Sequence, residues 1–351
     1  MKALVLAGGS GTRLRPLSYS LPKQLIPVAN TPVLVRCLRD IKEAGISDVG
    51  VVVNETDTQV RTALGDGSHG GLRLTYIPQH RPLGLAHCVK IARPFLGNDS
   101  FVMYLGDNVL MGGISAYAER FRARRPAAQI LVTPVTRPSE YGIAEIAPDG
   151  SLMSLQEKPQ SPRSDLAVVG IYFFTPAVHE VIRTLRPSAR GELEITEAIS
   201  ALVASGACVH ALSISSYWKD TGRVEDLLDC NREILDGLKP SCDGTVDRFS
   251  AVQGPVSIGP HSRIIRSHIK GPVIIGADAV ITGSTLGPYV AVGDGAVLTR
   301  TTMANSIALE RVLIDGVEDV RDSLIGRDAQ VLGSRRHRII TGDHSRIEVI
   351  A

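Results

Sequence analysis

The sequence predicts an α/β domain with a mostly parallel sheet, followed by a smaller domain of stacked strand coils. From residue 1 to about residue 235, short apolar runs alternate with amphipathic stretches, which is typical of alternating strands and helices. Beyond residue 250, aliphatic residues recur every 17 positions, which is typical of stacked repeats. The length of 351 residues also favours two domains, each with its own core.

The composition excludes several classes of protein. A formal net charge of +2 argues against a nucleic acid or a membrane surface as partner. No apolar stretch approaches the roughly 20 residues of a membrane span, and the apolar start is too short for a signal peptide. The scattered cysteines favour reduced thiols over a disulfide frame or a zinc site. They are Cys37, Cys88, Cys208, Cys230 and Cys242. We therefore expect a soluble, cytoplasmic protein.

The first predicted strand ends in a glycine-rich loop. Gly8, Gly9 and Gly11 follow an apolar run directly, and glycine allows positive φ and close approach of backbone N–H groups to a ligand. Arg13 and Lys23 then supply the fixed positive charge that a polyphosphate needs. The spacing fits neither a Walker-type loop nor a dinucleotide fingerprint. Taken alone, the glycines are equally compatible with an ordinary turn.

The next elements continue the alternation of strand and helix. Apolar residues on one helical face predict a helix over 32–44. In such sheets ligands bind beyond the carboxyl ends of the strands, and Asp107 stands at such an end, where it could hold a divalent metal. A lone Asp after a strand is more often a turn or cap residue. The predicted strands are 4–6, 49–53, 72–77, 101–105, 130–135 and 211–214.

Taken together, the motifs resemble those of the sugar-phosphate nucleotidylyltransferases over nearly all of residues 1–235. The likeness is to the long-form thymidylyltransferases of that family that act on glucose 1-phosphate. It implies a Rossmann-like fold for the first domain. The matching motifs, in family order, are Gly8–Arg13, Pro22–Leu25, Tyr76–His87, Leu105–Asn108, Glu140–Gly142, Gln156–Pro159, Val168–Tyr172, Ser188–Glu197 and Tyr217–Gly222.

The resemblance implies a nucleotide site. Gln79 would pair with the edge of a pyrimidine base through its amide, and Gly84 would let the base approach the backbone. Leu83 and His87 depart from the Asp and Gln of related thymidylyltransferases, and His87 alone is more often a structural histidine than a catalyst. The implied nucleotide-binding residues are Leu6, Gly8, Gly9, Gly11, Thr12, Gln79, Gly84 and Asp107.

The resemblance also implies a sugar-phosphate site and a metal site. Glu157 would accept hydrogen bonds from sugar hydroxyls, although Glu157-Lys158 could equally be a solvated charge pair worth about 0–1 kcal/mol. Asp107 and Asp220 would hold Mg²⁺ together with phosphate oxygens. The implied sugar-phosphate residues are Asn108, Tyr141, Gly142, Glu157, Lys158, Val169 and Arg190.

The reaction implied is nucleotidyl transfer from dTTP to α-D-glucose 1-phosphate, giving dTDP-glucose and pyrophosphate. Arg13 and Lys23 would hold the leaving pyrophosphate, and Lys158 and Arg190 would orient the attacking phosphate. Such catalysis depends on positioning and charge neutralisation. The alternatives are use of UTP or another nucleotide, another hexose 1-phosphate, and a regulatory homologue without activity.

The second domain begins after a predicted linker over residues 236–250. Ile264, Ile281 and Leu298 mark the repeat spacing, and aliphatic-Gly steps such as Ile258-Gly259 resemble those of the left-handed parallel β-helix. The register changes after Met303, so we expect about three regular coils within 251–351 and an irregular tail whose cluster Arg335, Arg336 and Arg338 is a solvated surface. Such stacks favour a homo-oligomer, as a dimer, trimer or tetramer. Acyl transfer with His261 or His268 as base is an alternative role.

Overall fold

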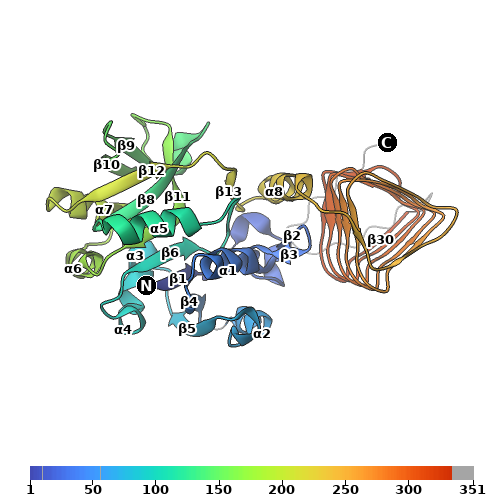
Figure 1. Cartoon of the computed structure of the whole chain (residues 1–351), viewed down its shortest axis with the longest axis horizontal. Coiled ribbons are helices and arrows are strands. Elements are labelled where there is room, and N and C mark those ends of the chain that lie inside the picture. The colour runs from blue at the N-terminus through green and yellow to red at the C-terminus, as the bar shows by residue number, and fades with distance from the viewer. Residues whose placement is uncertain (10, 56, 334–351) are drawn as a thin grey trace. The chain divides into compact units, whose positions relative to one another are not determined.

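The computed structural model describes residues 1–9, 11–55 and 57–333 of the chain. These residues form two compact units (Figure 1), the first made of residues 1–9, 34–55 and 57–220 and the second of residues 11–33 and 221–333. This division differs from the predicted one, because residues 11–33, which follow the first strand, belong to the C-terminal unit. The predicted tail, with Arg335, Arg336 and Arg338, lies outside the described residues.

The first unit is built on a mixed sheet whose centre is parallel. Strands β6, β1, β4 and β5 lie side by side in that order and run parallel. On the other side of β6, β11 runs antiparallel and leads to β9 and β10, while β8 joins β11 to β12. The strands are β1 Lys2–Leu6, β4 Asp48–Asn54, β5 Arg73–Gln79, β6 Phe101–Leu105, β8 Ala128–Pro134, β9 Gly142–Ile146, β10 Leu152–Glu157, β11 Leu166–Phe174 and β12 Val209–Ser213.

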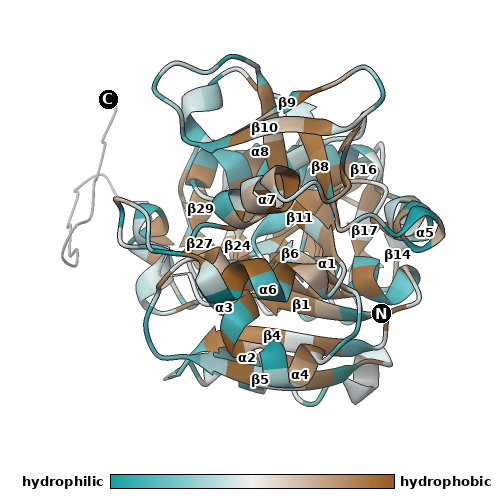
Figure 2. Ribbon diagram, turned by 90° about the vertical axis from the view of Figure 1, so that its left-hand side faces the viewer, coloured by the Kyte–Doolittle hydropathy of each residue, from teal (hydrophilic) through white to brown (hydrophobic). Residues whose placement is uncertain are grey.

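Helices flank this sheet and bury its strands on both faces, which is why the strands read as almost continuous apolar runs. Figure 2 shows hydrophobic residues concentrated in the central strands β1, β8 and β11. The predicted strands and the helix predicted over 32–44 are confirmed. The helices are α1 Val33–Glu43, α2 Gln59–Leu64, α3 Leu85–Ile91, α4 Arg93–Leu96, α5 Ser115–Arg124, α6 Ala177–Thr184, α7 Ile195–Ala204 and, in the second unit, α8 Val224–Asp236. None of the helices in the described part of the chain has the length and apolar character that a membrane-spanning helix needs.

A short ribbon follows β6 at its carboxyl end. Strand β7 (Asn108–Leu110) pairs antiparallel with β13 (Trp218–Asp220), so that Asp220 lies opposite Asn108. The predicted strand 211–214 corresponds to β12, which ends at Ser213, and Asp220 lies in the separate strand β13.

The second unit contains three parallel sheets that stack coil upon coil (Figure 1), consistent with the left-handed parallel β-helix that we expected. Its aliphatic core, which includes Ile264, Ile281 and Leu298, is fully buried, and each such side chain contributes about 1.5–3 kcal/mol. The first sheet contains β14 Ser241–Cys242, β17 Val256–Ile258, β20 Val273–Ile275, β23 Val290–Val292, β26 Ser306–Ala308 and β29 Leu324–Ile325. The second contains β15 Thr245–Val246, β18 Arg263–Ile265, β21 Val280–Thr282, β24 Val297–Thr299, β27 Leu313–Asp315 and β30 Gln330–Leu332. The third contains β16 Ala251–Gln253, β19 His268–Lys270, β22 Thr285–Leu286, β25 Thr302–Ala304 and β28 Val320–Arg321.

The stack begins earlier than we predicted, and its coils stay regular beyond Met303. Strands β14 and β15 lie in the expected linker 236–250 and already pair with β17 and β18. The register change after Met303 does not end the repeat, since it results from the lengths of two corners. Leu286 pairs with Met303 and Val290 pairs with Ser306, so the corner after Met303 is shorter by a single position than the corner after Leu286.

The lost position is regained at the next corner. Leu298 pairs with Ile314 and Met303 pairs with Val320, so the corner after Ile314 is longer by a single position than the corner after Leu298. The strands therefore keep their places in all three sheets as far as Leu332. His261 and His268, the residues considered for acyl transfer, are both exposed on this stack.

Candidate active site

Two aspartates lie in or next to the ribbon of β7 and β13. Asp107 is almost buried, with 9% of its surface exposed, at the carboxyl end of β6. Asp220 lies opposite Asn108, the residue after Asp107. Residues opposite one another in an antiparallel pair have Cα atoms about 5 Å apart, so the backbone of Asp220 lies close to that of Asn108, whose side chain bonds to Asp107. The two aspartates, called here the acidic site, are thus linked through Asn108.

This acidic site has the ligands that Mg²⁺ prefers. Mg²⁺ is commonly held by one or two protein carboxylates together with substrate phosphates and water, and less often by a full protein cage. In the described ranges, no group of three or more His, Cys, Asp or Glu side chains is arranged to hold a metal. Asp107 and Asp220 therefore fit an ion that arrives with a phosphate ligand.

A chain of polar and aromatic contacts leads from the acidic site toward Gly142. Asn108 donates from Nδ2 to Asp107 Oδ1 at 3.0 Å, and its Oδ1 accepts from Trp218 Nε1 at 2.7 Å. The Trp218 ring meets the edge of the Tyr141 ring at 5.8 Å between centroids. Asn108, which is 2% exposed, is thus fixed in orientation by both neighbours.

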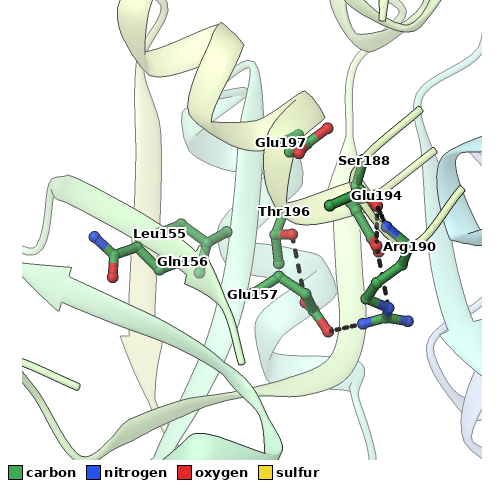
Figure 3. A pocket seen from close by; sticks show the side chains of 9 residues that line it. Leu155, Gln156, Glu157, Ser188, Arg190, Glu194, Thr196 and Glu197 are labelled. Carbon is green, nitrogen blue, oxygen red and sulfur yellow. Dashed lines mark hydrogen bonds and ion pairs between the residues drawn. The ribbon is translucent and has the colours of Figure 1, made fainter. Parts of the chain in front are cut away.

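Beyond Tyr141 lies a cavity of about 410 Å³, shown in Figure 3. Glu157 stands at the end of β10, where its Oε2 accepts from Thr196 Oγ1 at 3.4 Å. A Cβ at Gly142 would lie 3.3 Å from Glu157 Oε2, so a larger residue there would crowd this carboxylate. The cavity is lined by Leu155, Gln156, Glu157, Ser188, Ala189, Arg190, Glu194, Thr196 and Glu197.

Arg190 is held inside this cavity by carboxylates. Its guanidinium lies 3.3 Å from Glu157, 2.9 Å from Glu192 and 3.6 Å from Glu194. Burial alone would lower the pKa of Arg190, but Glu194, Glu192 and Glu157 outweigh it and raise the pKa above its ordinary value. Burial raises the pKa of Glu194, against the hydrogen bond from Ser188 and the charge of Arg190. A phosphate that binds Arg190 must therefore compete with three carboxylates.

Lys158 and Val169 lie near these groups with different surroundings. Lys158 is exposed and has a φ of +43°, and its backbone N–H donates to Tyr141 O at 2.9 Å. Val169 is fully buried in β11. A Cβ at the next residue, Gly170, would lie 2.9 Å from Asn108 Oδ1, so this part of β11 packs closely against Asn108.

The Gln79 amide lies at the end of β5. Its Nε2 lies 3.1 Å from His87 Nδ1 and 3.2 Å from Cys88 Sγ, both on α3. Burial, aided by Lys90, lowers the pKa of His87, which favours the neutral ring that accepts a hydrogen bond. On the other side, a Cβ at Gly8 would lie 3.4 Å from Gln79 Oε1. The carbonyl oxygen of Gln79 thus faces the glycine loop after β1, where Leu6 is buried and Gly9 is exposed.

The backbone at Gly84 itself requires glycine, and its predicted role next to the base stays a prediction. Its φ is +98°, and a Cβ there would lie 2.5 Å from Leu193 O. Leu193 O also accepts from Ala86 N at 3.0 Å. The backbone of Leu193 therefore leaves no room for a side chain at Gly84.

Gly11, Thr12, Arg13 and Lys23 belong to the second unit. Gly11 has a φ of +59° and packs between Ser18 and Lys23, since a Cβ there would lie 3.1 Å from Ser18 Cβ and 3.2 Å from Lys23 Cβ. The exposed Arg13 lies against Gly222, where a Cβ would be 2.9 Å from Arg13 Nη2.

Comparison with known proteins agrees with this arrangement. The nucleotidyl transferase family matches residues 2–237. The chain belongs to the nucleotidyl transferase family. This transferase is 52% identical to a glucose-1-phosphate thymidylyltransferase of Streptomyces antibioticus and 47% identical to one of Streptomyces griseus, each over 99% of both chains. It also resembles the solved structure of a Bacillus anthracis protein assigned as a glucose-1-phosphate thymidylyltransferase, with 34% identity and a TM-score of 0.62 over 66% of this chain and 94% of that one.

Sequence reasoning missed the second layer of side chains around the site of this enzyme. Glu194 and Thr196 line the cavity, and neither was among the implied site residues. Glu194 is 5% exposed, between the buried Leu193 and Ile195. A carboxylate flanked by buried apolar residues is the signal that could have identified it. His87, considered structural, turns out to contact the predicted base-pairing amide.

Proposed function

We propose that this enzyme transfers the dTMP group of dTTP to α-D-glucose 1-phosphate, giving dTDP-glucose and pyrophosphate. An oxygen of the sugar phosphate attacks the α-phosphorus, and the bond from that phosphorus to the oxygen bridging to the β-phosphate breaks in line. The attacking phosphate is already ionised, so the step needs no protein nucleophile or base. The names of the Streptomyces relatives support these substrates.

The single observation that carries the proposal is the pairing of Asp220 with Asn108, the residue after Asp107. These two carboxylates would hold Mg²⁺, which when bound neutralises charge on the phosphates. Arg13 and Lys23 bind the departing pyrophosphate, while Lys158 and Arg190 orient the attacking phosphate. Glu157 accepts from the sugar hydroxyls, and Gln79 pairs with the base. Thr12 remains a nucleotide-binding residue in this proposal.

The residues that border the hexose, the oligomeric state and the cellular location also belong to this proposal. Gly142 and Tyr141 border the hexose, as predicted for this family, and the homo-oligomer and the cytoplasmic location rest on the arguments from sequence. Initial rates with dTTP, UTP and other nucleotides, each with glucose 1-phosphate and two other hexose 1-phosphates, decide the substrate pair. Absence of pyrophosphate release with every pair would indicate a regulatory homologue.

The proposal is tested by Asp107→Asn. A neutral amide binds phosphate-bound Mg²⁺ far less well than a carboxylate does. We therefore expect the rate of pyrophosphate release to fall by at least about 10³-fold. Circular dichroism should remain that of the parent protein. The matched control is Asp149→Asn, which changes an exposed aspartate in the turn before β10. Near-normal turnover in Asp107→Asn would remove the metal assignment.

A further inference from the structure

The segment of residues 11–33, called here the N-terminal segment, is fastened to the β-helix within the second unit. It ends in a hairpin of β2 (Pro27–Val28) and β3 (Thr31–Pro32). The two residues between these strands, Ala29 and Asn30, have φ values of +45° and +56°. Two left-handed residues in a two-residue connection make a type I′ turn, which projects a tight, well-defined tip. Ala29 is 4% exposed, so this tip is buried against other parts of the unit.

One buried amide joins the hairpin tip to the β-helix. Asn231 of α8 is fully buried, and its Oδ1 accepts from the backbone N–H of Ala29 at 3.0 Å. Its Nδ2 donates to Tyr289 O, at the corner before β23, at 3.3 Å. Both ends of the side chain are thus bonded to segments far apart in sequence. A buried amide with both ends satisfied specifies one arrangement of its partners.

A second contact on the tip reaches the β-helix directly. Asn30 donates from Nδ2 to Val292 O, within β23, at 2.7 Å. The other part of the N-terminal segment meets the last coil, where Arg327 Nη2 lies 3.5 Å from Ser20 O. A Cβ at Gly326 would lie 3.1 Å from Leu17 Cδ2, so the Leu17 side chain packs onto this coil. The coils containing β23 and β29 therefore hold the segment at two places.

These two attachments flank the cations assigned above to pyrophosphate. Lys23 lies between Ser20 and Ala29 in sequence, and its Cβ packs beside Gly11. Ser18 Oγ donates to Gly11 O at 2.7 Å, which links the start of the segment to the part attached at Leu17. Displacement of either attachment would therefore move Lys23 and the loop that carries Arg13.

We propose that the β-helix is a positioning element of the active site, and that Asn30 and Asn231 are positioning residues for the cations that bind pyrophosphate. The inference rests on the proposed function, since it takes Arg13 and Lys23 as the pyrophosphate ligands. It assigns to the C-terminal coils a part in binding the triphosphate, in addition to any part in assembly.

The experiment compares Asn30→Gly with the parent enzyme. Glycine keeps the positive φ of the turn and removes only the amide that bonds to Val292, so the variant isolates this contact. We expect the KM for dTTP and the product-inhibition constant for pyrophosphate to rise about three- to tenfold, the range for one neutral hydrogen bond. The KM for glucose 1-phosphate and kcat should stay within about twofold. Asn231→Ala should shift the same two constants further.

The matched control is Arg300→Gly. Arg300 also has positive φ, +47°, and its Nη2 joins two coils through Asp315 Oδ1 at 2.6 Å. This variant should change neither constant.

Lys23→Ala separates the two proposals. If it raises both constants while Asn30→Gly and Asn231→Ala do not, the inference is overturned and the proposed function stands. If Lys23→Ala has no effect, the pyrophosphate role of Lys23 and the inference that rests on it are both overturned. An equal rise in KM for both substrates in Asn30→Gly would indicate general loosening and would also overturn the inference. Should Asn231→Ala not fold, Asn30→Gly alone decides.

Discussion

At the scale of single residues, the orientation of the Gln79 amide is set by its neighbours on α3. The lowered pKa of His87 leaves its ring neutral near pH 7, so that Nδ1 can accept from Gln79 Nε2. Gln79 then presents its carbonyl oxygen on the side of Gly8. A pyrimidine such as thymine or uracil carries a ring N–H that a carbonyl oxygen can accept. His87 thus helps to choose which end of the amide faces a base.

We predict that His87→Ala lowers kcat/KM for dTTP about three- to tenfold, because the Gln79 amide loses one hydrogen bond that fixes it. The KM for glucose 1-phosphate should not change. His87→Gln, which restores an acceptor oxygen and the residue of related thymidylyltransferases, should recover most of the loss. Steady-state kinetics with each substrate varied in turn would measure both effects. Unchanged kinetics in His87→Ala would show that Gln79 is held by Cys88 alone.

At the scale of single elements, helix α1 carries a carboxylate that is costly to ionise. Asp40 accepts from Tyr104 Oη on β6 at 2.9 Å. Burial raises the pKa of Asp40 to about 6, against the opposing effect of this hydrogen bond. Between the unfolded pKa near 4 and this folded value, the native protein binds more protons than the unfolded chain. Ionisation of Asp40 therefore lowers the stability as the pH rises through this window.

We predict that Asp40→Asn raises the free energy of unfolding at pH 7.5 by about 1–3 kcal/mol, since the amide still accepts from Tyr104 and carries no charge. The gain should shrink toward zero as the pH falls to about 4, where Asp40 is protonated in both states. Urea unfolding of both proteins across this range would test it. A gain that is independent of pH would contradict the assignment. The comparison must be between the two proteins, because His179, whose pKa burial lowers to about 4, acts in the opposite direction.

The helices and strands were the most predictable part of the chain, and the corners between strands of the β-helix were the least predictable. Apolar runs such as Phe101–Leu105 determined the strands, because burial on both faces leaves a continuous signal. The coils after Met303 were predicted to be irregular, because a change of a single position at each of two corners shifts the spacing without changing the pairing. The acid pair followed from the family motifs. The two hydrogen bonds of Asn231, to Ala29 and to Tyr289, could not be predicted. Nothing in the local sequence of α8 indicates partners that lie 202 and 58 residues away.

At the scale of the whole molecule, the core of the β-helix and the N-terminal segment belong to one compact unit. Leu298 is fully buried in the stack between Ile281 and Ile314. We predict that Leu298→Ala costs about 2–5 kcal/mol of stability in this unit. Native-state hydrogen exchange should then show faster exchange at the amide of Ala29 than in the parent protein. The amide of Val5, in the first unit, serves as the internal control. Equal acceleration at both amides would show that the chain unfolds as one body.

The bond from Asn30 to Val292 also has a consequence for how the protein is made. The two residues are 262 positions apart, and a ribosome adding about 5–20 residues per second needs roughly 13–50 seconds to travel that distance. During that interval the hairpin tip has been synthesised but its acceptor has not. A nascent chain halted before the later coils would carry Asp107 and Asp220, but its hairpin tip would still lack the bond to Val292. The N-terminal segment can therefore reach its final attachment only after the coil that contains β23 has been synthesised.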